Sequence, residues 1–77
     1  MDFMDLHERL ADYISGKVRN GELTVRGLAR RAGVSQPHLH HVLKGKRFLS
    51  FKSASLLLHE LGLNISDLTR LKIEPRH

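Results

Sequence analysis

The chain has 77 residues, a formal net charge of +5 and no cysteine. At this length we expect a single domain over residues 1–77 with one modest core, and the absence of cysteine excludes a disulfide framework and a thiolate metal site. No apolar run approaches the roughly 20 residues that span a bilayer, so we expect a soluble, cytoplasmic protein without a membrane partner.

The basic residues are concentrated in the middle of the chain. Residues 23–59 hold seven Lys or Arg and no Asp or Glu, whereas the two flanking segments together hold six basic and eight acidic residues. A block of one charge is typical of a protein that binds a polyanion. A solvated basic face would have the same composition, so charge alone leaves both interpretations open.

The first predicted helix ends near Asn20-Gly21, because apolar residues recur at helical spacing up to that point. Its stripe consists of Phe3, Leu6, Leu10, Ile14 and Val18. Asp5 and Glu8 have the spacing of a capping box, and Asp2 is an alternative N-cap. His7 is expected to be exposed.

Two short helices separated by a tight turn are predicted next. Thr24 would cap the first, Gly33 would supply the positive φ of the turn, and Ser35 would cap the second. The buried stripe of the first consists of Val25, Leu28, Ala29 and Ala32. In the second, Leu39, Val42 and Leu43 share one face, and Gln36, Pro37, His40, His41 and Lys44 lie away from it.

The remaining chain predicts two more helices. One runs from about Ser50 to Leu61 and stops at Gly62, and a short one begins around residues 64–66 and carries Leu68 and Leu71. No segment alternates as a strand does. We therefore expect an all-α fold of five helices.

Residues 25–44 have the layout of a DNA-reading helix-turn-helix. Ala29 is small where the two helices meet, Gly33 makes the turn and Val34 fills the corner. Leu39 and Val42 would seat the second helix on the core, which leaves its outer face free to enter a major groove.

The chain resembles the phage-repressor and Cro-like helix-turn-helix regulators. The resemblance covers roughly residues 6–69, and its strongest part is Leu28-Ala29-Arg30-Arg31-Ala32-Gly33-Val34-Ser35-Gln36 followed by Leu39, Val42 and Lys44-Gly45-Lys46-Arg47. It implies a compact lambda-repressor-like domain that reads double-stranded operator DNA, and a function as a transcriptional regulator. The chain departs from the family at Val25, at Gly27 and at Phe48-Leu49, which replaces a polar residue followed by proline.

The resemblance also implies the DNA contacts. Bases would be read by Gln36, Pro37, His40 and His41. Phosphates would be bound by Ser35, Arg26, Lys44, Lys46 and Arg47. Arg30 and Arg31 are expected to face solvent and to act only at long range.

Related domains bind DNA as two-fold pairs, so we expect a homodimer. The candidate contacts are the apolar residues Phe48, Leu49 and Leu56, with Leu63 and Leu68 extending the patch. Phe48 and Leu49 could instead fold back over the core, and the sequence leaves both options open.

Other function classes have weaker support. No nucleophile lies beside a base and no phosphate loop occurs, so we expect neither an enzyme nor a cofactor. His38 and His41 could share a helix face, but no acidic residue or cysteine lies near them in the sequence, so no metal site is expected. The alternatives to a DNA-binding regulator are the antitoxin of a toxin–antitoxin pair and an adaptor that binds an unknown protein partner.

Overall fold

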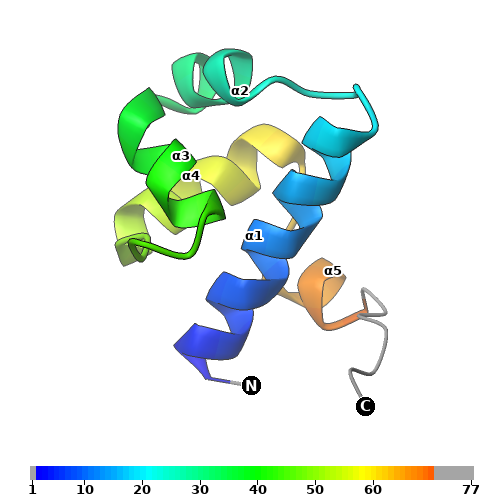
Figure 1. The fold of residues 1–77 in the computed structure, drawn as a ribbon. Helices are drawn as coiled ribbons and strands as arrows, with labels where there is room; N and C mark the ends of the chain where they lie inside the picture. Colours follow the sequence, from blue (N-terminus) through cyan, green and yellow to red (C-terminus); the bar gives the residue numbers. More distant parts are fainter. Residues whose placement is uncertain (1, 71–77) are drawn as a thin grey trace.

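Five helices follow one another in the computed structural model, which describes residues 2–70. They are α1 (Phe3–Arg19), α2 (Val25–Ala32), α3 (Gln36–Leu43), α4 (Phe51–Leu61) and α5 (Ile65–Arg70). In Figure 1, α2 lies across the top of the molecule, α3 and α4 lie on one side of α1, and α5 lies on the other. The described part of the chain contains no strand, and the predicted all-α class is confirmed.

Side chains cap the start of the first four helices. In each case, the cap accepts a hydrogen bond from the backbone amide three residues further on; the caps are Asp2, Thr24, Ser35 and Ser50. Such a cap satisfies an amide that has no partner inside the helix. The capping box at Asp5 and Glu8 is wrong, because the amide of Asp5 itself donates to Asp2 Oδ1 at 2.9 Å and α1 already begins at Phe3.

Gly33 makes the turn between α2 and α3, as predicted. Its φ of 77° is in the left-handed region, which strains any residue with a side chain. The amides of Gly33 and Val34 both donate to the carbonyl of Ala29 at 2.9 Å, which ends α2 within one turn. The chain then enters α3 at once, with Val34 buried in the corner between the helices.

One hydrophobic core joins all five helices. Its members are Leu6, Leu10, Ile14, Leu28, Ala29, Ala32, Val34, Leu39, Val42, Leu49, Ala54, Leu57, Leu58 and Leu68. The predicted stripes of α2 and α3 are therefore buried, although Val25 and Leu43 are only partly so. Because α3 packs on both α1 and α2, the core fixes the orientation of α3 on the body. Leu71 lies outside the described residues.

His7 corrects one expectation, since it is buried rather than exposed. Its ring lies 5.2 Å from the ring of Phe48, edge on, and 6.5 Å from that of Phe3. Burial lowers the pKa of His7, because the charged form loses hydration, and the nearby carboxylate of Glu8 opposes this only in part. The Nε2 atom is buried and has no hydrogen-bond partner.

Candidate nucleic-acid interface

The outer face of α3 is the candidate surface for reading bases. Leu39 and Val42 are buried, so the helix presents its opposite side to solvent. The exposed side chains on that side are Gln36, Pro37, His40 and His41. All four predicted base-reading residues therefore share one open surface, and none of their side chains belongs to the hydrophobic core.

The start of α3 adds a positive end to this surface. Ser35 caps the helix, with its Oγ 3.4 Å from the amide nitrogen of His38, and no acidic residue stands in the first turn. Free amides and the helix dipole make such an end attractive to an anion. Ser35 and Gln36 are both exposed beside it.

Four exposed cations flank α3. Arg26 lies near the start of α2, and Lys44, Lys46 and Arg47 follow the end of α3. None of the four forms a salt bridge within the described part of the chain. Their charges are therefore not neutralised locally and remain available to phosphates.

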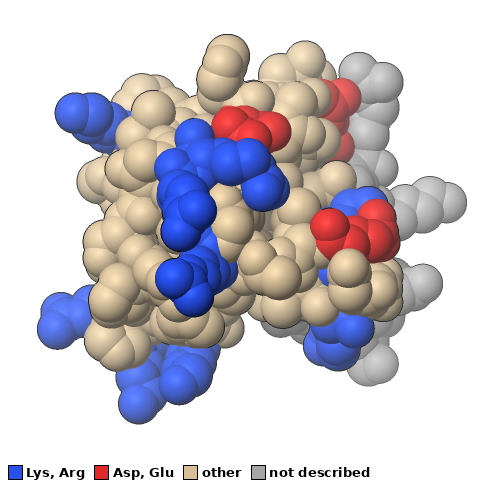
Figure 2. Space-filling model, turned by 90° about the horizontal axis from the view of Figure 1, so that it is seen from above, with Lys and Arg blue, Asp and Glu red and all other residues tan. Residues whose placement is uncertain are grey.

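Lys and Arg also prevail across the neighbouring surface. Figure 2 shows the molecule from the side that carries α2, where Lys and Arg side chains are spread widely and Asp and Glu side chains are fewer. Three residues of the block without acidic residues, Arg26, Arg30 and Arg31, lie on α2. A field of one sign draws an oppositely charged polymer toward the surface before contacts form.

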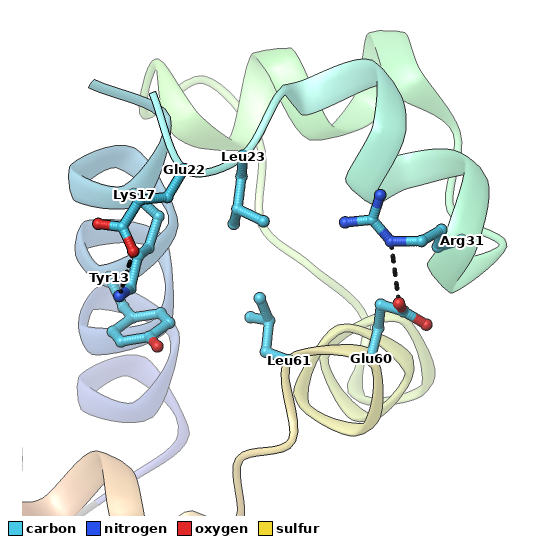
Figure 3. A pocket seen from close by; sticks show the side chains of 7 residues that line it. All are labelled: Tyr13, Lys17, Glu22, Leu23, Arg31, Glu60 and Leu61. Carbon is cyan, nitrogen blue, oxygen red and sulfur yellow. Dashed lines mark hydrogen bonds and ion pairs between the residues drawn. The ribbon is translucent and has the colours of Figure 1, made fainter. Parts of the chain in front are cut away.

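Arg31 differs from these cations because it is paired. Its Nε lies 3.0 Å from Oε2 of Glu60 on α4, and this pair forms one side of a pocket of about 250 Å³. On the other side Lys17 lies 3.0 Å from Glu22, and Leu23 and Leu61 lie between the two pairs (Figure 3). Arg30 is exposed, as expected. The sequence did not reveal that an acid beyond the basic block neutralises Arg31.

The histidines of α3 do not form a metal-binding group. His38 is partly buried, whereas His40 and His41 are exposed. Among the residues that the structure describes, no three His, Cys, Asp or Glu side chains lie close enough together to hold a metal ion.

The predicted dimer contacts fall into different environments. Leu49 is 3% exposed and belongs to the core, so its place on an exposed dimer patch is corrected. The same holds for Leu68, which is fully buried, and Leu63 packs partly against the core. Phe48 is 63% exposed, and Leu56 is 36% exposed on α4.

Sequence reasoning missed two exposed aromatic residues. Phe51 is 70% exposed, and its ring lies 6.4 Å from that of Phe3, which is itself 37% exposed. The spacing of Phe51 concealed this exposure, because Phe51 lies three residues before Ala54 and seven before Leu58, as a member of a buried stripe would.

No helix in the described range is both long and apolar enough to cross a membrane. Comparison of the chain with protein-family models, with curated proteins and with solved structures gave no match.

Proposed function

We propose that this protein binds double-stranded DNA at specific sequences through α3 and acts as a repressor-like transcriptional regulator. The observation that carries this proposal is the outer face of α3, which is polar, exposed and flanked by unpaired cations. A major groove is wide enough to admit one α-helix. The turn at Gly33 sets the direction of α3, and the buried Leu39 and Val42 pack the helix on the core. The outer face is therefore held rigidly on the body of the domain.

The exposed side chains of α3 match the chemistry of base edges. The carboxamide of Gln36 can bond to N6 and N7 of adenine at once, and Pro37 offers an apolar contact to a thymine methyl group. An imidazole N–H of His40 or His41 can donate to N7 or O6 of guanine. These four residues would supply the sequence preference.

The cations around α3 would supply affinity and register. Lys44, Lys46 and Arg47 lie at one end of the helix, and Arg26 lies on α2. These cations would contact the phosphates beside the groove, with Ser35 as a further hydrogen-bonding group. Contacts of this kind position a protein on the duplex without reading its sequence.

One recognition helix covers only a few base pairs, so we propose that two copies bind together on an inverted repeat. The half-sites would lie about 10–10.5 base pairs apart, one helical turn, so that both α3 helices enter the same side of the duplex. Selection of binding sites from random duplexes tests existence, sequence and symmetry together. A selected pool with no shared sequence would refute sequence-specific recognition.

Salt dependence tests the electrostatic part. Each phosphate that the protein neutralises releases about 0.9 of a counterion, so affinity should fall steeply with salt. Lys46→Ala should weaken binding to preferred and random DNA alike and flatten the log–log slope by about one per subunit. The matched control is Lys17→Ala, which removes a lysine already paired with Glu22 and should change neither quantity. A wild-type slope near zero would refute the DNA proposal.

A further inference from the structure

The pocket between α1, α2 and α4 is a second polar site, separate from α3. Its lining residues belong to these three helices and to the connection between α1 and α2, and none belongs to α3. Figure 3 shows an ion pair on each of two opposite walls and two leucines between them. A molecule bound there would use no residue of the candidate DNA-reading surface.

The Arg31–Glu60 pair uses only one nitrogen of the guanidinium. Nε of Arg31 donates to Oε2 of Glu60 at 3.0 Å, and the two outer nitrogens lie on the side away from Glu60, with one of them directed toward Leu23 (Figure 3). These two nitrogens have no partner among the described residues. The side chain of Arg31 is 51% exposed, so a solute can reach them. Arg31 therefore keeps a planar set of N–H donors for a further acceptor.

Gly27 leaves room for this orientation of Arg31. The two residues lie about one turn apart on α2, and a Cβ at Gly27 would lie 3.2 Å from Nη1 of Arg31 and 2.9 Å from Oγ1 of Thr24. Glycine inside a helix lowers the stability of the helix. Here the missing side chain lets the guanidinium lie beside the first turn of α2 and line the pocket.

Apolar side chains form the middle of the pocket. Leu23 and Leu61 are half-buried and point toward each other from opposite sides (Figure 3). On the wall opposite Arg31, the ammonium of Lys17 lies 3.0 Å from Glu22 and 5.4 Å from the centroid of the Tyr13 ring. That wall is already neutralised, so the donors of Arg31 decide which polar group a ligand brings.

Size and charge define the class of ligand. The pocket volume of about 250 Å³ exceeds the roughly 150 Å³ of an apolar cavity that holds benzene, so one six-membered ring fits together with a small substituent. A carboxylate can accept two parallel N–H bonds from a guanidinium, and such charge-assisted bonds are about twice as strong as neutral ones. Arg26 and Arg30 on α2 and the net charge of +5 favour an anion over a cation.

We propose that this pocket binds a small aromatic monocarboxylate, with its carboxylate on the outer nitrogens of Arg31 and its ring between Leu23 and Leu61. The ligand and Glu60 occupy different edges of the guanidinium, which keeps the two carboxylates apart. Because the ligand is small and the guanidinium is half exposed, the affinity is modest, with a Kd of about 1 mM. This binding goes beyond the proposed function and does not depend on it.

Titration of the ¹⁵N-labelled protein with benzoate, followed by NMR, tests the site. In about 0.15 M salt, where exposed charges are screened, the amides of Leu23 and Leu61 and the Nε–H of Arg31 should shift and saturate together. Benzamide keeps the ring without the charge, and acetate keeps the carboxylate without the ring. Each should bind at least about fivefold more weakly than benzoate. Shifts that are largest around Lys44–Arg47 would show only attraction of an anion to a basic surface, and would overturn the proposal.

Three variants test the role of Arg31. Arg31→Gln should weaken benzoate binding about tenfold, because it removes the charged fork. Arg30→Gln is the matched control, since it removes the neighbouring exposed arginine on α2, which does not line the pocket, and should change little. Glu60→Gln breaks the ion pair but keeps the guanidinium, so it should bind benzoate as well as wild type or more tightly.

The three variants also separate ligand binding from support of the fold. The dispersion of the amide signals shows whether each variant is folded. If Glu60→Gln lost as much affinity as Arg31→Gln, the ion pair would matter only for the shape of the pocket, and the assignment of the carboxylate to Arg31 would be wrong. Equal losses in Arg30→Gln and Arg31→Gln would likewise refute a specific site.

Discussion

The outer face of α3 and the exposed rings of Phe3, Phe48 and Phe51 differ in what their exposure means. Gln36, His40 and His41 are well hydrated when exposed, so their position in water carries little energetic information. Phe48 and Phe51 are not, and their joint exposure is the less expected observation. An exposed polar surface therefore indicates a function only through the types and spacing of its residues. A group of exposed apolar side chains is unusual in itself.

The largest effect is expected in the connection between α3 and α4. There the side chain of Phe48 is exposed, whereas that of the next residue, Leu49, is buried in the core. Leu49→Ala should reduce the free energy of unfolding by about 2–5 kcal/mol, since it leaves a cavity among buried residues. Phe48→Ala should cost less than about 1 kcal/mol in the monomer. Urea unfolding at low protein concentration measures both values. Equal losses of unfolding free energy would show that Phe48 contributes to the core as much as Leu49 does.

A smaller effect is expected on the polar side. Gln36→Ala and His41→Ala should each lose about 1–3 kcal/mol of binding free energy on the selected site and relax the preference at one base position. Binding to random DNA should hardly change, and neither variant should alter self-association. His59→Ala, an exposed histidine on α4, is the control. Titrations with both duplexes would contradict base reading if the losses on them were the same.

The smallest expected effect concerns His7, whose buried ring contacts those of Phe3 and Phe48. Burial lowers its pKa in the folded state, whereas the unfolded chain keeps a value of about 6.5. The unfolded state therefore binds more protons below that pH, and the free energy of unfolding should fall as pH decreases from 6.5 toward the lowered value. His7→Leu should lose part of this dependence, and His59→Gln should keep it. An identical pH profile in His7→Leu would show that His7 does not titrate in this range.

The local features of the fold were predictable from the sequence, because neighbouring residues decide them. Thr24 and Ser35 were expected as caps and Gly33 as the turn, and each has that role. For α1, the sequence left the N-cap open between Asp2 and Asp5, which lie one helical turn apart, and the cap is Asp2. The same spacing placed Gln36, His40 and His41 on one open face, although whether that face reads DNA stays a prediction.

The features that the sequence did not reveal depend on contacts between distant segments. His7 is buried because α1 packs beside Phe48, and Arg31 is neutralised by Glu60 on α4. Phe3, Phe48 and Phe51 come together only because α1, the α3–α4 connection and α4 meet. Helical periodicity describes one helix at a time and cannot identify which of its edges meets another segment.

The connection between α3 and α4 has a further consequence for the kinetics and entropy of binding. It is fastened at one end by the amide of Lys46, which donates to the carbonyl of His41 at 2.8 Å, and at the other by the buried Leu49. Lys46 and Arg47 therefore project from a backbone that is ordered before any ligand arrives. Preorganisation reduces the conformational entropy lost on binding. Gly substitutions that loosen this span, while keeping both charges, should weaken phosphate contacts mainly through faster dissociation.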